Sequence, residues 1–145
     1  MSTEFDTLAG EYWASPPYDD HVHDESVHAF DTIQDLLLDA DDAELSALLR
    51  ALARSAPTAR DLAYVGATWV VGLEYRFDAE GDTGRSIAVL AAAGLDADLV
   101  VGILAGIAPD WLSAMGAPAR LDGVLQPAQI AWLVNADAEG RSVCL

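Results

Sequence analysis

Apolar residues recur along the chain at intervals of three and four, the spacing that lines one face of an α-helix. In residues 24–39 these positions include Val27, Phe30, Ile33 and Leu37, so the pattern predicts a helix there. Its other side is acidic. The aspartates on or beside that side are Asp24, Asp31, Asp35 and Asp39. Like charges one turn apart repel by about a few tenths of a kcal/mol per pair, so helix stability alone does not favour them.

The next two helices are marked by their end signals. Asp41 with Glu44 three residues later is close to a capping box, and Pro57 ends the leucine stripe that follows. Thr58 repeats the start signal, and the helix it predicts covers residues 59–78. The middle of that helix is apolar on all sides, so we expect it to be central and buried.

Shorter helices are predicted over residues 85–93, 96–108, 109–116 and 126–134, with Gly94 closing the first of them. No turn dipeptide is flanked by the alternating pattern of a hairpin. The sequence therefore predicts an all-α fold: a compact bundle of about six or seven helices. We expect a single domain over residues 1–145, with its helical core in residues 24–145.

Residues 1–23 contain a glycine and a double proline, and we expect them to form an irregular arm. This arm carries Trp13 and Tyr18, which we predict to be exposed anchors for a partner. The alternative, that the arm packs both rings onto its own domain, stays open at this point.

Residues 42–57 weakly resemble residues 96–109, since each begins with Asp-Ala-acid-Leu and ends at a proline. Two such helix pairs could stack as HEAT-like units. Alanine-rich helices produce such similarities readily, so a true repeat and a plain bundle both stay open.

The charge is strongly negative and uneven. The 145 residues hold 24 acids against 7 basic residues, all of them arginine, for a net charge of −17. Thirteen of the acids lie in the first 49 residues, which contain no arginine. So few cations cannot neutralise a phosphate backbone, which excludes a direct nucleic-acid binder. With 52% hydrophobic residues, the chain is also unlike a disordered one.

Three explanations of this acidity stay open: solubility combined with a GC-rich coding bias, adaptation to salt, and a partner with a basic face. Adaptation to salt would spread the acids over the whole surface. The acid-rich, arginine-free first third favours a local interaction surface. Its predicted partner-binding residues are Asp31, Asp35, Asp39, Asp41, Asp42 and Glu44, with Trp13 and Tyr18.

Candidate catalytic chemistry is sparse. His21, His23 and His28, together with Asp24, could gather a divalent ion, but no established zinc-ligand motif accompanies them, and we predict no metal or cofactor. Glu74 is expected to form a structural ion pair that orients the end of its helix rather than to act as a catalytic acid, and Arg76 could pair with either neighbouring element.

Other motifs favour structure over catalysis. Cys144 stands near the end of the chain, and no serine lies in a nucleophile elbow. Gly102 and Gly106 fit a close helix contact better than a phosphate loop. We expect a protein that is not an enzyme.

The compartment is predicted from absences in the sequence. The N-terminal residues lack the basic and apolar regions of a signal peptide, and the apolar stretches are too short to span a bilayer. With one cysteine, no disulfide can form within a monomer. We expect a cytoplasmic protein that binds no membrane.

The stretch from Ala56-Pro57 through Tyr64-Val-Gly-Ala67 to Leu73-Glu74 resembles a loose group of small, uncharacterised helical proteins from GC-rich bacteria. The resemblance covers about 20 of the 145 residues. It implies only an acidic α-helical fold, since that group carries no settled activity. The segment between Ala67 and Leu73 is longer here than in that group, so the helix register is not carried over.

Charge and size lead to one functional hypothesis: a small inhibitor of the immunity or antitoxin type, covering a basic surface of a toxin or nucleic-acid enzyme. A DNA mimic is its strongest form. The alternatives are a non-catalytic scaffold or regulatory subunit whose acids only confer solubility, and, third, a small metal-dependent enzyme.

Overall fold

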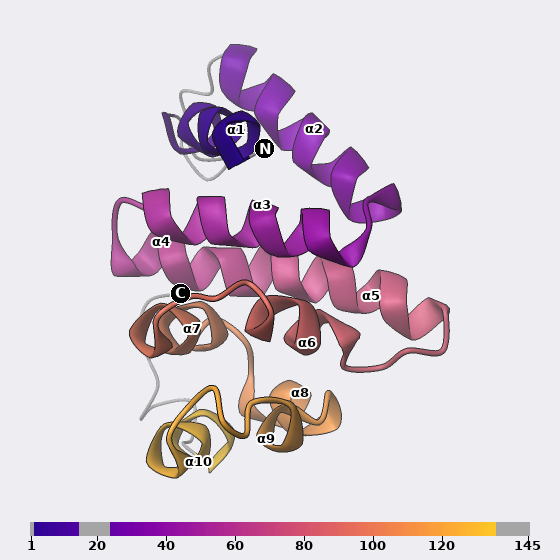
Figure 1. Cartoon of the computed structure of the whole chain (residues 1–145), viewed down its shortest axis with the longest axis vertical. Coiled ribbons are helices and arrows are strands. Elements are labelled where there is room, and N and C mark those ends of the chain that lie inside the picture. Colours follow the sequence, from indigo (N-terminus) through magenta and orange to yellow (C-terminus); the bar gives the residue numbers. More distant parts are fainter. Residues whose placement is uncertain (1, 15–23, 136–145) are drawn as a thin grey trace.

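The computed structural model describes residues 2–14 and 24–135, and all regular structure in these ranges is helical (Figure 1). The helices are α1 (Ser2–Ala14), α2 (Asp24–Asp39), α3 (Asp42–Ser55), α4 (Ala59–Tyr64), the π-helix η1 (Val65–Val70), α5 (Val71–Ala79), α6 (Arg85–Ala91), α7 (Ala97–Leu104), α8 (Pro109–Ala114), α9 (Ala117–Arg120) and α10 (Pro127–Asn135). The all-α prediction is confirmed, and every helix predicted from the sequence is present.

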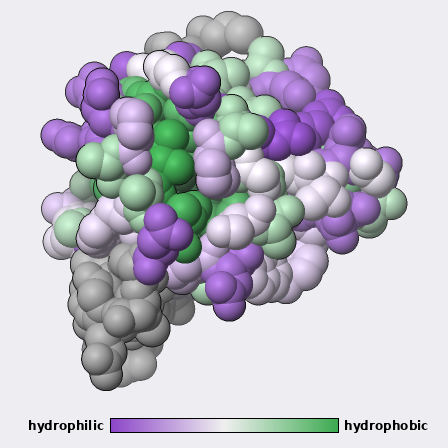
Figure 2. Space-filling view, turned by 90° about the horizontal axis from the view of Figure 1, so that it is seen from below, coloured by the Kyte–Doolittle hydropathy of each residue, from purple (hydrophilic) through white to green (hydrophobic). Residues whose placement is uncertain are grey.

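The helices are stacked in layers. Helices α1 and α2 pack together above α3, which lies beside the long α4–η1–α5 helix across the middle of Figure 1. Below them come α6 and α7, and then the short helices α8, α9 and α10. Seen from below, the molecule carries a narrow band of hydrophobic residues between hydrophilic ones (Figure 2). Helices α3 and α7 share the weak sequence similarity but point in different directions. In Figure 1, α3 lies across the view and α7 is seen end-on.

The predicted start signals form as expected. At α3, the Glu44 amide donates to Asp41 Oδ1 at 2.8 Å and the Asp41 amide donates to Glu44 Oε1 at 3.4 Å, which completes the capping box. At α4, the Asp61 amide donates to Thr58 Oγ1 at 3.1 Å. These caps satisfy amides that have no partner within their own helix.

Helix α4, the π segment and α5 form one continuous helix from Ala59 to Ala79. Val65, Trp69, Val70 and Leu73 are buried along it, as expected from its apolar middle. The prediction of a central buried helix is confirmed. The wider π turn rotates the following residues away from ideal α-helical positions, and the sequence pattern gave no sign of it.

Three glycines, one in η1, one in α7 and one just after α7, let the central helix and this segment approach each other closely. A Cβ atom on Gly106 or on Gly66 would meet the backbone, at Ala63 O or at Ile103 O respectively. A Cβ on Gly102 would meet the side chain of Leu62. The prediction that Gly102 and Gly106 allow two helices to approach closely is confirmed.

The prediction of an irregular N-terminal arm is wrong for residues 2–14, which form α1. Phe5, Leu8 and Tyr12 follow helical spacing and pack against the core, and Gly10 is tolerated inside the helix at an exposed position. The apolar face of α1 outweighs the cost of one glycine, about 1 kcal/mol relative to alanine.

Candidate functional site

The candidate site is the acidic surface formed by α2, the turn after it and the first turn of α3. On α2, Asp31, Asp35 and Asp39 are exposed and follow one another at four-residue steps. This spacing places a carboxylate about every 6 Å along one side of the helix. Within the described part of the chain, none of these three side chains makes a hydrogen bond or an ion pair.

The carboxylates of the turn and of α3 have structural partners. Asp41 and Glu44 form the capping box, yet both side chains are exposed. Asp42 accepts two hydrogen bonds from Arg85, at 2.8 Å from Nη2 and 3.1 Å from Nε. The hydrogen bond to Asp42 raises the pKa of Arg85. This bidentate pair joins the start of α3 to the start of α6.

Three of the predicted acids surround one shallow depression between α2 and α3. Asp35, Asp39 and Glu44 line it together with Thr32, Leu36 and Ala40. No arginine or histidine is among these lining residues. The guanidinium of Arg76 donates to the carbonyls of Leu37 and Ala40 at the end of α2, where it complements the negative end of the helix dipole. The folded chain therefore gathers carboxylates from two helices around an open depression that has no cation among its lining residues.

The prediction that Trp13 is an exposed anchor for a partner is wrong. Trp13 is buried, and its Nε1 donates to the Leu52 carbonyl at 3.0 Å, because α1 packs against α3. Tyr18 lies outside the described residues. Sequence reasoning missed Leu38, which is 70% exposed and stands on α2 between Asp35 and Asp39. Its place outside the buried positions of the helical stripe is the signal that could have found it.

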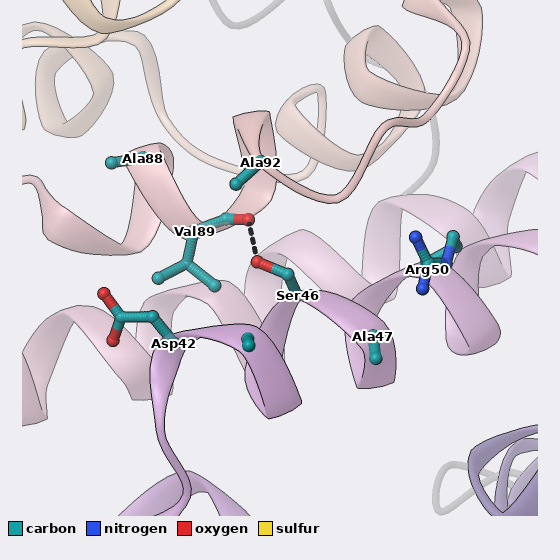
Figure 3. A pocket seen from close by; sticks show the side chains of 8 residues that line it. Asp42, Ser46, Ala47, Arg50, Ala88, Val89 and Ala92 are labelled. Atoms are coloured by element: carbon teal, nitrogen blue, oxygen red, sulfur yellow. Dashed lines mark hydrogen bonds between the residues drawn. The ribbon is translucent and has the colours of Figure 1, made fainter. Parts of the chain in front are cut away.

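A second groove lies between α3 and α6 (Figure 3). Its walls are largely alanine, with Asp42 towards one end and Arg50 towards the other. Ser46 Oγ donates to the Val89 carbonyl at 2.7 Å, and Arg50 donates to the Ala93 carbonyl at 3.2 Å. These hydrogen bonds hold the two helices together. The polar groups of the groove therefore have a structural role, and none of them is arranged as a nucleophile or a general base.

Glu74 is buried, but the ion pair expected of it does not form among the described residues. Its Oε2 accepts from the Gly84 amide at 2.7 Å and its Oε1 accepts from Ser86 Oγ at 2.8 Å. Arg76 instead reaches α2 and Glu80. Glu74 thus caps the start of α6, and its structural role is that of a hydrogen-bond acceptor.

Three other buried polar atoms, Tyr12 Oη, Trp69 Nε1 and Asp61 Oδ1, make no hydrogen bond within the described structure. The rings of Tyr12 and Trp69 are in edge contact, with centroids 5.7 Å apart. Burial raises the pKa of Tyr12 and also that of Asp61, whose Oδ2 accepts from the Thr58 hydroxyl. These atoms come from α1, α4 and η1.

The candidate metal ligands are only partly covered by the structure. His21 and His23 lie outside the described residues, and Asp24 and His28 are placed only as backbone in α2. Among the described residues no group of histidine, cysteine and acidic side chains is arranged to hold a metal. None of the described helices combines the length and apolar character that crossing a bilayer requires.

In comparisons with known proteins, the chain matches no family model, no curated protein and no solved structure.

Proposed function

We propose that this chain is a cytoplasmic, non-enzymatic inhibitor of the immunity or antitoxin type. Its acidic surface would cover a basic face of a toxin or of an enzyme that acts on nucleic acid. The carboxylates of Asp31, Asp35, Asp39, Asp41, Asp42 and Glu44 would stand where the phosphates of the nucleic acid otherwise bind.

The observation that carries this proposal is the depression shared by Asp35, Asp39 and Glu44. Asp35 and Asp39 of α2 line this hollow together with Glu44, which also caps α3, and no cation is among the lining residues. Solubility alone does not require carboxylates from two helices to share one hollow. Convergence of like charges costs folding energy, so a partner that supplies the missing positive charge gives the arrangement a purpose.

The mechanism has two parts. The field of the acidic surface draws a basic partner in and orients it, which raises the association rate and makes it depend on salt. Leu38, exposed on α2 beside the carboxylates, would then add apolar contact with the partner. Leu38 thereby takes the role expected of Trp13.

A helical scaffold or regulatory subunit is the alternative, and in it the acids serve only solubility. The two readings differ in what a neutralised acidic surface does to binding. In the first, loss of the depression's charge slows association with the partner. In the second, it leaves association unchanged.

The test is a charge-neutral triple variant, Asp35→Asn, Asp39→Asn and Glu44→Gln. Glutamine at position 44 can keep the capping box, so α3 retains its start. A partner captured by the wild-type chain is identified, purified and mixed with each variant in stopped-flow measurements at low and high salt. We expect association to slow at least about tenfold at low salt.

The matched control removes three exposed acids elsewhere, with Asp96→Asn, Asp98→Asn and Asp110→Asn. It has the same net charge as the test variant, and Asp96 makes no side-chain cap bond at α7. Equal slowing in both variants would mean that the overall charge of the protein, and not the depression, determines the association rate. An unchanged rate in the test variant would contradict the proposal and favour the scaffold.

A further inference from the structure

A second surface feature lies between the end of α5 and α8, on elements that take no part in the acidic surface. It is a cleft lined by Glu74, Tyr75, Asp78, Thr83, Trp111, Ala114 and Met115. Tyr75 is 64% exposed and Trp111 is 41% exposed, although both are large aromatic side chains. Their ring centroids are 5.7 Å apart and the ring planes meet at 80°. Two exposed rings at nearly a right angle form the walls of a corner.

The corner is negatively charged. Asp78 is one turn after Tyr75 on α5 and is exposed. The Thr83 hydroxyl donates to its Oδ1 at 2.6 Å, and both residues line the cleft together with the two rings. The buried Met115 and Glu74 also line the cleft, and none of the lining residues is a cation. Arg120, which is not among them, donates to the Thr83 carbonyl.

Aromatic faces and a carboxylate are together complementary to an organic cation. The face of a tryptophan or tyrosine ring attracts a cation through the ring quadrupole, and a fixed carboxylate supplies the opposite charge. Among protein cations, the guanidinium of arginine fits best because it is planar, stacks on aromatic faces and is weakly hydrated.

We propose that the cleft formed by Tyr75, Asp78 and Trp111 binds the guanidinium group of an arginine side chain presented by a partner protein. The guanidinium stacks against the indole of Trp111 and donates to the carboxylate of Asp78, and Tyr75 closes the side of the corner. This inference does not rest on the proposed inhibitor function, since a partner of any function could present the arginine.

The test uses capped pentapeptides with a single central arginine, lysine or citrulline between glycines. Binding is followed by NMR through the indole N–H signal of Trp111 in the full chain. Trp132 serves as an internal reference, because it is 40% exposed and does not line this cleft. We expect the arginine peptide to shift the Trp111 signal in a saturable way, the lysine peptide to bind more weakly, and the neutral citrulline peptide to give no saturable shift.

Two variants keep the same reporter. Asp78→Asn should weaken arginine binding about threefold, as expected for an exposed ion pair. Tyr75→Ala should weaken it by a similar factor of about threefold through loss of one ring. Asp98→Asn, which removes an exposed acid from α7, should leave binding unchanged. Equal shifts at Trp132 and Trp111, equal binding of arginine and citrulline, or no response at Trp111 would each overturn the proposal.

Discussion

Two groups of carboxylates in this molecule differ in what they do for the fold. Those of Asp31, Asp35 and Asp39 on α2 are exposed, and among the described residues they have no partner. Those of Asp42 and Glu74 join helices, one through Arg85 and the other through the start of α6. The first group can be lost without removing a contact, whereas loss of either member of the second removes a link between helices.

The difference separates charge that folds the protein from charge that is available to a partner. An acid that holds two helices together has a structural role; Asp42 has this role through Arg85 and also lies on the acidic surface. A row of acids that repel each other and touch nothing needs another explanation. The net charge of −17 counts both groups together and therefore hides the distinction.

The largest effect is expected at Glu74. Glu74→Ala leaves the Gly84 amide and the Ser86 hydroxyl without an acceptor in a buried place, which should lower the free energy of unfolding by about 3 kcal/mol. Urea unfolding measures the loss. Glu80→Ala, which removes an exposed partner of Arg76, should cost less than about 1 kcal/mol. Equal losses in the free energy of unfolding for Glu74→Ala and Glu80→Ala would contradict the difference proposed between buried and surface acids.

A smaller, pH-dependent effect is expected at Asp61. Burial raises the pKa of its carboxyl in the folded state, so folding favours the protonated form. The stabilisation is complete below the ordinary aspartate pKa of about 3.9 and is lost as the pH rises through the raised pKa. Asp61→Asn removes this dependence. The Tm of the variant should therefore rise relative to that of the wild type as the pH increases from about 3 to about 7. A constant difference in Tm across this range would contradict the assignment.

The smallest effect on stability is expected on α2. Replacing Asp31, Asp35 and Asp39 by asparagine removes repulsion and no contact, so the free energy of unfolding should stay within about 0.5 kcal/mol of the wild type or rise slightly. The same urea measurement checks it. A loss of more than about 2 kcal/mol would show that these acids belong to the structural group after all.

Local sequence signals predicted most of the helices, because caps and stripes depend on residues close together in the chain. Asp41, Thr58 and Pro109 mark helix starts that the structure contains. Helix α1 was missed because Gly10 and the prolines after it outweighed its short apolar face. The π turn was missed because a segment that is apolar on all sides carries no register.

The site was predictable only in part. The exposed row on α2 follows from its spacing, but the depression depends on the angle between α2 and α3, which no local pattern specifies. The pair of Arg85 with Asp42 spans 43 residues, and the corner of Tyr75 and Trp111 joins two helices that are also far apart in the chain. Contacts of this kind are set by packing.

The close contact of the central helix with α7 has a consequence for motion. Where Gly66 and Gly106 bring backbone against backbone, no layer of side chains can change rotamer to accommodate sliding. The two helices therefore open together or not at all, as one cooperative unit. Their amide hydrogens should therefore exchange with solvent slowly and together.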